Sequence, residues 1–196
     1  MIQLDVDDLP PEELAFRFSS GRLCLAFCAT VGERWRRSFE RLRTPDDLSR
    51  WLVQAGLAEG DVPVPTDVLD EARLLRESVY RLVRAAMAGQ PGLAADRELV
   101  NACARRPAVA LQFGPDGDRR LWTGNEPARA GLAAVAIDAV EVLTGDEIGR
   151  VRECDASDCA LLFVDTSRPG RRRWCADGVC GSRARSAAYR TRRSVR

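Results

Sequence analysis

Four cysteines in the last quarter of this 196-residue chain constrain its fold more than any other feature. Cys154, Cys159, Cys175 and Cys180 are spaced as C-x4-C-x15-C-x4-C. Two close pairs, each held by one turn, can present four sulfurs to one tetrahedral zinc ion. The spacing therefore predicts one zinc ion per chain. Because the protein supplies all four ligands, we expect the ion to be structural and not catalytic.

The alternative is that the four cysteines are small buried hydrophobic residues, because unpaired cysteine is often buried. The size of the segment favours zinc, since about 45 residues bury too little apolar surface to fold without an added cross-link such as a structural metal ion. The sequence between the pairs, ALLFVDTSRPGRRRW, predicts two strands, at 161–164 and reaching Trp174, around a Ser-Arg-Pro-Gly turn. With a helix starting at the last cysteine pair, the order resembles a treble-clef finger.

The other three cysteines form no comparable set. Cys24 and Cys28 lie four residues apart in an apolar run, and Cys103 is alone. We predict that all three fill the core.

Charge is distributed unevenly along the chain. The sequence carries 30 basic and 29 acidic residues, but ten of the arginines and only one acidic residue, Asp177, follow residue 165. The body is therefore acidic and the tail strongly basic. Such asymmetry indicates a polyanionic partner for the tail.

Residues 180–196 predict a helix with two unlike halves. One half carries small residues, which we expect to pack on the finger: Cys180, Ala184, Ala187, Ala188, Thr191 and Val195. The other half carries arginines. With those of the preceding hairpin they give the candidate nucleic-acid-binding residues, Arg171, Arg172, Arg173, Arg183, Arg185, Arg190, Arg192 and Arg193. The alternatives are a solvated face, or docking on acidic surfaces such as Asp5, Asp7 and Asp8 of the same or another subunit.

Two residue types are absent, and their absence restricts the chemistry of the chain. There is no histidine, and every basic residue is arginine. Histidine bases, Schiff-base lysines and P-loop lysines are excluded, and no paired motif marks a carboxylate or thiolate site, so we expect no enzyme. The acidic start resembles no signal peptide, and no apolar run approaches a membrane span. We expect a cytoplasmic protein with reduced cysteines and no membrane partner.

The region before the cysteine set predicts a mainly helical domain with one β-hairpin, giving an α+β chain. We expect helices at 44–57, at 67–88 with Thr66 as the cap, at 93–105 and at 127–144, the last central to the core. The hairpin spans 107–124 around a Gly-Pro-Asp-Gly turn. The apolar run after Gly21 is buried, but its pattern does not separate strand from helix. We place one domain at 1–149 and the finger at 150–196.

Two stretches of the chain resemble known families. The string LLFVDTSRPGRRRWC, between flanking cysteines and followed by Cys180-Gly181-Ser182-Arg183, resembles the CGNR zinc finger family, with Ser182 in place of the signature Asn. The strings GRLCLAFCATVGER and TPDDLSRWLVQAGL resemble the ABATE domain of proposed stress-induced transcription regulators, with Ala29 where that family usually has Asn. The resemblance implies a zinc-containing DNA-binding regulator.

These observations lead to one principal hypothesis and one alternative. In the first, domain 1–149 senses a small-molecule ligand or mediates assembly such as homodimerisation, and the finger presents its basic helix to DNA. In the alternative, the chain is a protein-interaction module whose finger packs on its own N-terminal domain or on a partner subunit.

Overall fold

A computed structural model of the chain describes residues 9–194. Its helices are α1 (Pro11–Leu14), α2 (Leu23–Cys28), α3 (Pro45–Gln54), α4 (Thr66–Met87), α5 (Ala94–Ala104), α6 (Pro127–Thr144) and α7 (Ser182–Ser194). Its strands form three antiparallel pairs: β1 (Val31–Gly32) with β2 (Phe39–Glu40), β3 (Ala110–Phe113) with β4 (Arg119–Trp122), and β5 (Val151–Glu153) with β6 (Leu162–Val164). The chain is thus α+β, as the sequence predicts. No helix in this part of the chain is long and apolar enough to cross a membrane.

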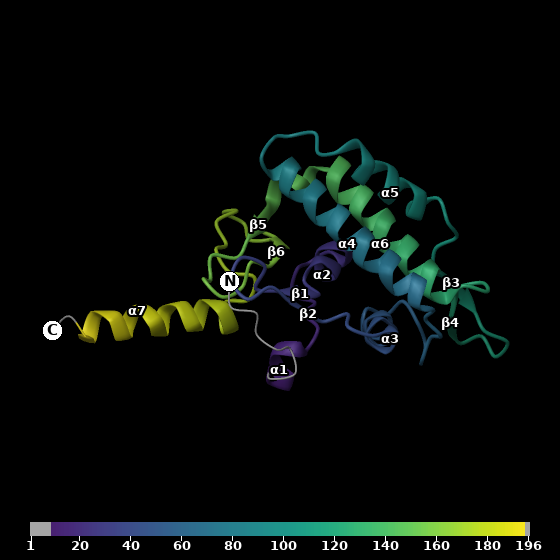
Figure 1. The fold of residues 1–196 in the computed structure, drawn as a ribbon, viewed down its shortest axis with the longest axis horizontal. Coiled ribbons are helices and arrows are strands. Elements are labelled where there is room, and N and C mark those ends of the chain that lie inside the picture. The colour runs from purple at the N-terminus through teal and green to yellow at the C-terminus, as the bar shows by residue number, and fades with distance from the viewer. Residues whose placement is uncertain (1–8, 195–196) are drawn as a thin grey trace.

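The main core lies between α2, α4, α5 and α6, which pack side by side (Figure 1). Helix α6 is central, as predicted, because small and apolar residues let neighbours approach it on several sides. At Gly131 a Cβ atom would lie 2.4 Å from Cδ2 of Leu52, so a larger residue would displace this buried side chain of α3. Cys24, Cys28 and Cys103 are buried in this core, as predicted, and α2 shows that the ambiguous apolar run is a helix.

The helix starts follow local capping chemistry in one case and not in another. Thr44 caps α3 in a complete capping box, in which Asp47 N–H donates to the Thr44 hydroxyl and the Asp47 carboxylate accepts from Thr44 N–H. The predicted cap at Thr66 is wrong by one residue. Pro65 occupies the cap position of α4, and Thr66 is the first helical residue, with no side-chain cap bond.

The β3–β4 hairpin forms as predicted, with Leu111 opposite Leu121 and a turn that contains Gly117 at φ 77°. It extends from the end of the molecule opposite α7 (Figure 1). Phe113 is 88% exposed there.

A short β1–β2 ribbon lies between the helical core and the C-terminal finger. Arg76 of α4 anchors it, donating to both oxygens of Glu40 at 2.7 Å. The tip of the Phe39 ring packs against Gly32, where a Cβ atom would be 2.3 Å from Cζ of the ring. The ribbon is therefore held to α4 by the Arg76–Glu40 pair, and its two strands pack closely through Phe39 and Gly32.

The strand pairing in the finger differs from the prediction. The expected second strand, ending at Trp174, does not form; β6 pairs instead with β5, which precedes the first cysteine. The backbone after the Ser-Arg-Pro-Gly turn bonds to a side chain, because Arg172 N–H donates to the Asp165 carboxylate at 2.9 Å. On its other edge, β6 is covered by Ser20, whose carbonyl accepts from Val164 N–H.

The predicted packing of α7 is also wrong. Its small-residue half does not lie on the finger: Ala184 is half-buried, while Ala187 and Thr191 are exposed. Figure 1 shows α7 extending away from the molecule, attached only at its first turn. The predictions for Val195 and for the acidic residues Asp5, Asp7 and Asp8 fall outside the described residues, as does the prediction for the side chain of Ala188.

Candidate metal centre and nucleic-acid interface

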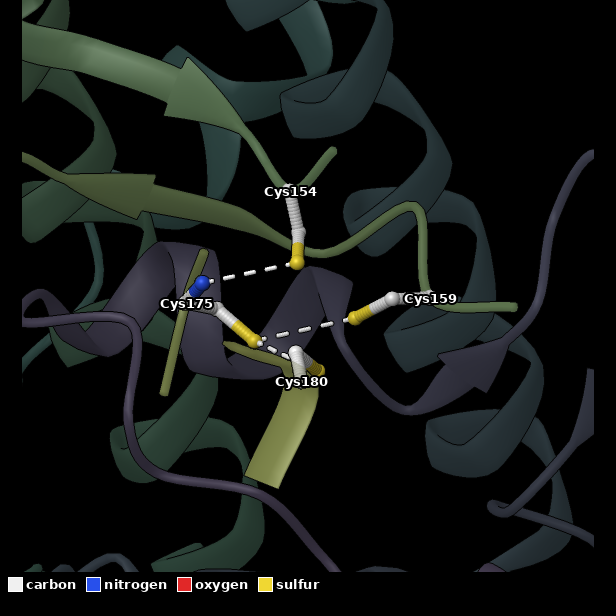
Figure 2. A group of neighbouring side chains, drawn as sticks. All are labelled: Cys154, Cys159, Cys175 and Cys180. Carbon is white, nitrogen blue, oxygen red and sulfur yellow. Dashed lines mark hydrogen bonds between the residues drawn. The ribbon is translucent and has the colours of Figure 1, made fainter. Parts of the chain in front are cut away.

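The four predicted cysteines converge on one point. Their sulfurs all lie within 4.8 Å of one another, and all four side chains are buried (Figure 2). The Sγ atoms of Cys159 and Cys175 are 3.6 Å apart, as are those of Cys175 and Cys180. Tetrahedral zinc with bonds of about 2.3 Å requires sulfurs about 3.8 Å apart. The donor set and its geometry therefore fit one zinc ion.

Two separate segments supply the ligands. Cys154 directly follows β5, and the turn that ends at Cys159 is closed by the bond from Cys159 N–H to Ala156 O. Cys175 and Cys180 come from the second segment, where η3 (Asp177–Gly181) forms a single π-helical turn before α7. This knuckle, hairpin and helix make a treble-clef-like finger.

Backbone hydrogen bonds hold the two segments together. Asp155 N–H donates to Arg173 O at 2.9 Å, and Cys175 N–H donates to the sulfur of Cys154 at 3.4 Å (Figure 2). An amide that donates to a zinc-bound sulfur stabilises its negative charge. The same contacts fix the distance between the two cysteine pairs.

Arg183 adds a full positive charge beside the metal site. Its guanidinium donates to the sulfur of Cys180 at 3.4 Å and pairs with Asp158 at 3.0 Å. The pKa of Cys180 is held well below its usual range, mainly by hydrogen bonds from the other three thiols and also by Arg183. Four thiolates with one zinc carry a net charge near −2, which this guanidinium partly offsets.

A carboxylate that the sequence analysis missed organises the loop between the pairs. Asp165 is fully buried, and its carboxylate accepts from Ser167 N–H and Oγ and from Arg172 N–H. These bonds, the one from Ser167 Oγ foremost, lower the pKa of Asp165 to about 2. The signal was present, because Asp two residues before Ser, and close to Pro-Gly, is typical of a side-chain-closed turn.

The structure explains the residue type at two positions of the tetrapeptide Cys180-Gly181-Ser182-Arg183. A Cβ atom on Gly181 would lie 2.6 Å from Asp177 Oδ1 and 3.2 Å from the Trp174 ring, so a larger residue here would displace the Asp177 side chain and crowd the ring. Ser182 retains a polar role in place of Asn, since its hydroxyl accepts from Arg185 at 3.2 Å. Ala29, the other departure, is buried in the apolar cluster of the finger.

The eight predicted nucleic-acid-binding arginines divide into two groups. Four have partners inside the finger: Arg172 bonds to Trp174 O and Cys175 O, Arg173 to Asp155, Arg183 to Asp158, and Arg185 to Asp177. The other four are Arg171, Arg190, Arg192 and Arg193. They are exposed, and their guanidinium groups form no hydrogen bond or ion pair with any residue of 9–194.

Comparison with known families agrees with this architecture. Residues 21–146 match the model of the ABATE family, described as "Putative stress-induced transcription regulator", and residues 150–193 match the CGNR zinc finger. No curated protein matches the chain at a significant level.

Proposed function

The chain belongs to the ABATE family, and on that premise we propose that it is a transcription regulator that binds duplex DNA through its zinc finger. Zinc fixes the finger, and α7 is the element that meets the duplex. The observation that carries the proposal is the exposure of α7 together with its unpaired arginines.

Helix α7 has the shape and charge that a DNA-binding helix needs. Its 13 residues are attached to the molecule only at the first turn, so most of its length is free to enter a groove or lie along phosphates. Arg190 and Arg193 share one face of the helix, three residues apart. An arginine without an internal partner gives up no ion pair when it binds phosphate, and its planar fork contacts two oxygens.

The paired arginines serve a different purpose in this proposal. Arg183 and Arg185 are held at the base of α7 by Asp158 and Asp177, so they fix the direction of the helix. They are positioning residues, and the unpaired arginines supply the contacts.

The test is the salt dependence of DNA binding. If the four unpaired arginines all neutralise phosphates, the plot of log K against log salt should have a slope of about −3.6. Replacing Arg190 and Arg193 by alanine should reduce that slope by about 1.8 and weaken binding at low salt. Fluorescence anisotropy with a short labelled duplex, titrated over about 50–200 mM KCl, measures both.

A matched control separates α7 from general charge. Arg105 and Arg119 are exposed arginines of the body whose side chains also have no hydrogen-bond or ion-pair partner among the described residues, and replacing both by alanine changes the net charge equally. This control should keep the slope of the parent protein. Undetectable binding at low salt, or an equal loss in both double variants, contradicts the proposal.

A further inference from the structure

A polar cleft of about 440 Å³ lies where the N-terminal part of the chain meets the finger. One wall is the segment that holds Glu13 and Arg17, the second is the β1–β2 ribbon with Arg41 after it, and the third is the finger around Asp158. The volume is that of a site for a small molecule and is far larger than a single water or chloride needs. The proposed DNA contacts of α7 do not use this cleft.

The acidic groups of the cleft are already paired. Glu33 accepts from Arg37 at 2.7 Å, and Glu13 also pairs with Arg37. Asp158 pairs with Arg183. The carboxylates that line the cleft are therefore not free to balance its other cations.

Two arginines of the cleft have no carboxylate partner among residues 9–194. Arg41 is only 4% exposed, and its Nε and Nη1 donate to the backbone carbonyls of Glu13 at 2.9 Å and Ala29 at 2.8 Å. Its Nη2 has no hydrogen-bond partner among residues 9–194. Arg17 is half-buried, and within the described chain it forms neither a hydrogen bond nor an ion pair.

This arrangement is electrostatically unfavourable without an anion. Burial, and then the nearby charge of Arg17, lower the pKa of Arg41 to about 10. A buried cation is costly unless it is paired, and here two guanidiniums face one cavity. The Phe39 ring, 4.7 Å from the Arg41 guanidinium carbon, limits how far that side chain can turn away.

The zinc site is the main competing explanation for the two cations. Cys159 lines the same cleft, and its thiolate attracts Arg41 through space. However, the side-chain hydrogen bonds of Arg41 within residues 9–194 go to carbonyl oxygens and not to sulfur, while Arg183 contacts Cys180 directly. Arg183 is thus the one guanidinium within residues 9–194 that is hydrogen-bonded to a zinc-ligand sulfur, and the remaining charge of the site acts on Arg41 only through space. Arg17 and Arg41 therefore still have side-chain donors to offer an anion.

We propose that the cleft binds a small organic anion whose carboxylate or phosphate group lies between Arg17 and Arg41. The guanidinium forks supply charge-assisted hydrogen bonds to its oxygens. Leu161 and Phe39 line the cleft beside them and accommodate a short apolar part of the ligand.

A regulatory consequence rests on the proposed DNA-binding function. Arg183 lines the cleft and also lies in the first turn of α7, beside the zinc ligand Cys180. A ligand in the cleft therefore touches the N-terminal part and the base of the DNA-binding helix together. The anion is expected to change the affinity for DNA by acting on the direction of α7.

Isothermal titration calorimetry of the zinc-loaded full chain tests the site. The probes are succinate and inorganic phosphate at fixed ionic strength, with succinamide as the neutral analogue of succinate. We expect at least one anion to bind while succinamide does not, and the tighter of the two identifies the preferred head group. Arg17→Gln should weaken that binding at least tenfold. Arg105→Gln, the same change at an exposed arginine outside the cleft, should leave it within twofold.

Three outcomes would overturn the proposal: no anion binds better than succinamide, both variants weaken binding equally, or Arg17→Gln lowers the zinc content and leaves anion affinity unchanged. The last result would assign Arg17 to the metal site. DNA affinity is measured separately by anisotropy with and without the anion. Anion binding without DNA binding would contradict the proposed function alone, and DNA binding without anion binding would contradict this inference alone.

Discussion

Replacement of Cys175 by serine is expected to unfold the finger and leave the helical core folded. Structural zinc contributes roughly 10–16 kcal/mol of apparent binding energy, which is folding energy in small units of this kind. The apolar cluster of the finger consists of its four cysteines with Ala29, Leu161 and Phe163. Burial of one leucine and one phenylalanine supplies only about 3–6 kcal/mol. The cluster therefore cannot replace the metal.

Hydrogen exchange read by mass spectrometry locates the effect, and elemental analysis counts the zinc. In Cys175→Ser, amides such as Cys154 N–H and Asp155 N–H, which bond to Leu161 O and Arg173 O, should lose protection. The amides of α4 and α6 should keep theirs, because the main core does not depend on the metal. The zinc content should fall well below one ion per chain.

The matched control is Cys103→Ser. Cys103 is equally buried, but its thiol donates to Glu71 Oε1 at 3.6 Å, a bond that a serine hydroxyl can also make. This variant should retain one zinc and a protected finger. The reasoning fails if Cys175→Ser keeps one zinc per chain with an unchanged exchange pattern, or if Cys103→Ser loses as much zinc.

Two further predictions concern stability. Gly32→Ala forces a Cβ atom to within 2.3 Å of the Phe39 ring, so we expect the free energy of unfolding to fall by about 1–3 kcal/mol in a thermal melt. Gly149→Ala is the control, because a Cβ atom there would meet no atom within 4 Å, and it should change the stability little. Equal melting midpoints for the two variants would contradict the packing argument. The Arg81 guanidinium holds the pKa of Asp96 below its usual range, so the pair stabilises the fold above the unfolded Asp pKa of about 3.9 and less as the pH falls below it. The destabilisation by Asp96→Asn, measured by urea unfolding, should therefore be largest near neutral pH and shrink in acid; a pH-independent difference would refute it.

The metal site could be predicted from the sequence because its signal is local. Each cysteine pair lies within one turn, and the spacing alone brings the two sulfurs of a pair together. The cap at Thr44 followed from local chemistry in the same way. The cap predicted at Thr66 was wrong by one residue, because the extended backbone of Pro65 is itself compatible with the cap position.

Strand pairing and the cleft depend on contacts between distant segments. Residues 151–153 pair with β6, whereas residues 171–174 do not, and Arg172 N–H bonds instead to the buried Asp165 side chain. No periodicity in the sequence predicts which of these two segments pairs with β6. Arg17, Arg41 and Arg183 are likewise far apart in the chain, so no spacing pattern could place them around one cavity. The helical pattern of α7 showed two unlike faces but not which of them has a neighbour.

Because α7 is attached only at its first turn, a small rotation at that end moves its far end by a larger distance. Its 13 residues span about 20 Å, and all of that length lies beyond Gly181. A rotation of roughly 10° at that base moves the far end by about 3.4 Å, which is the axial rise of one base pair. A side-chain rearrangement around Arg183 too small to disturb the core could thus shift the distal arginines by one nucleotide step along a bound duplex.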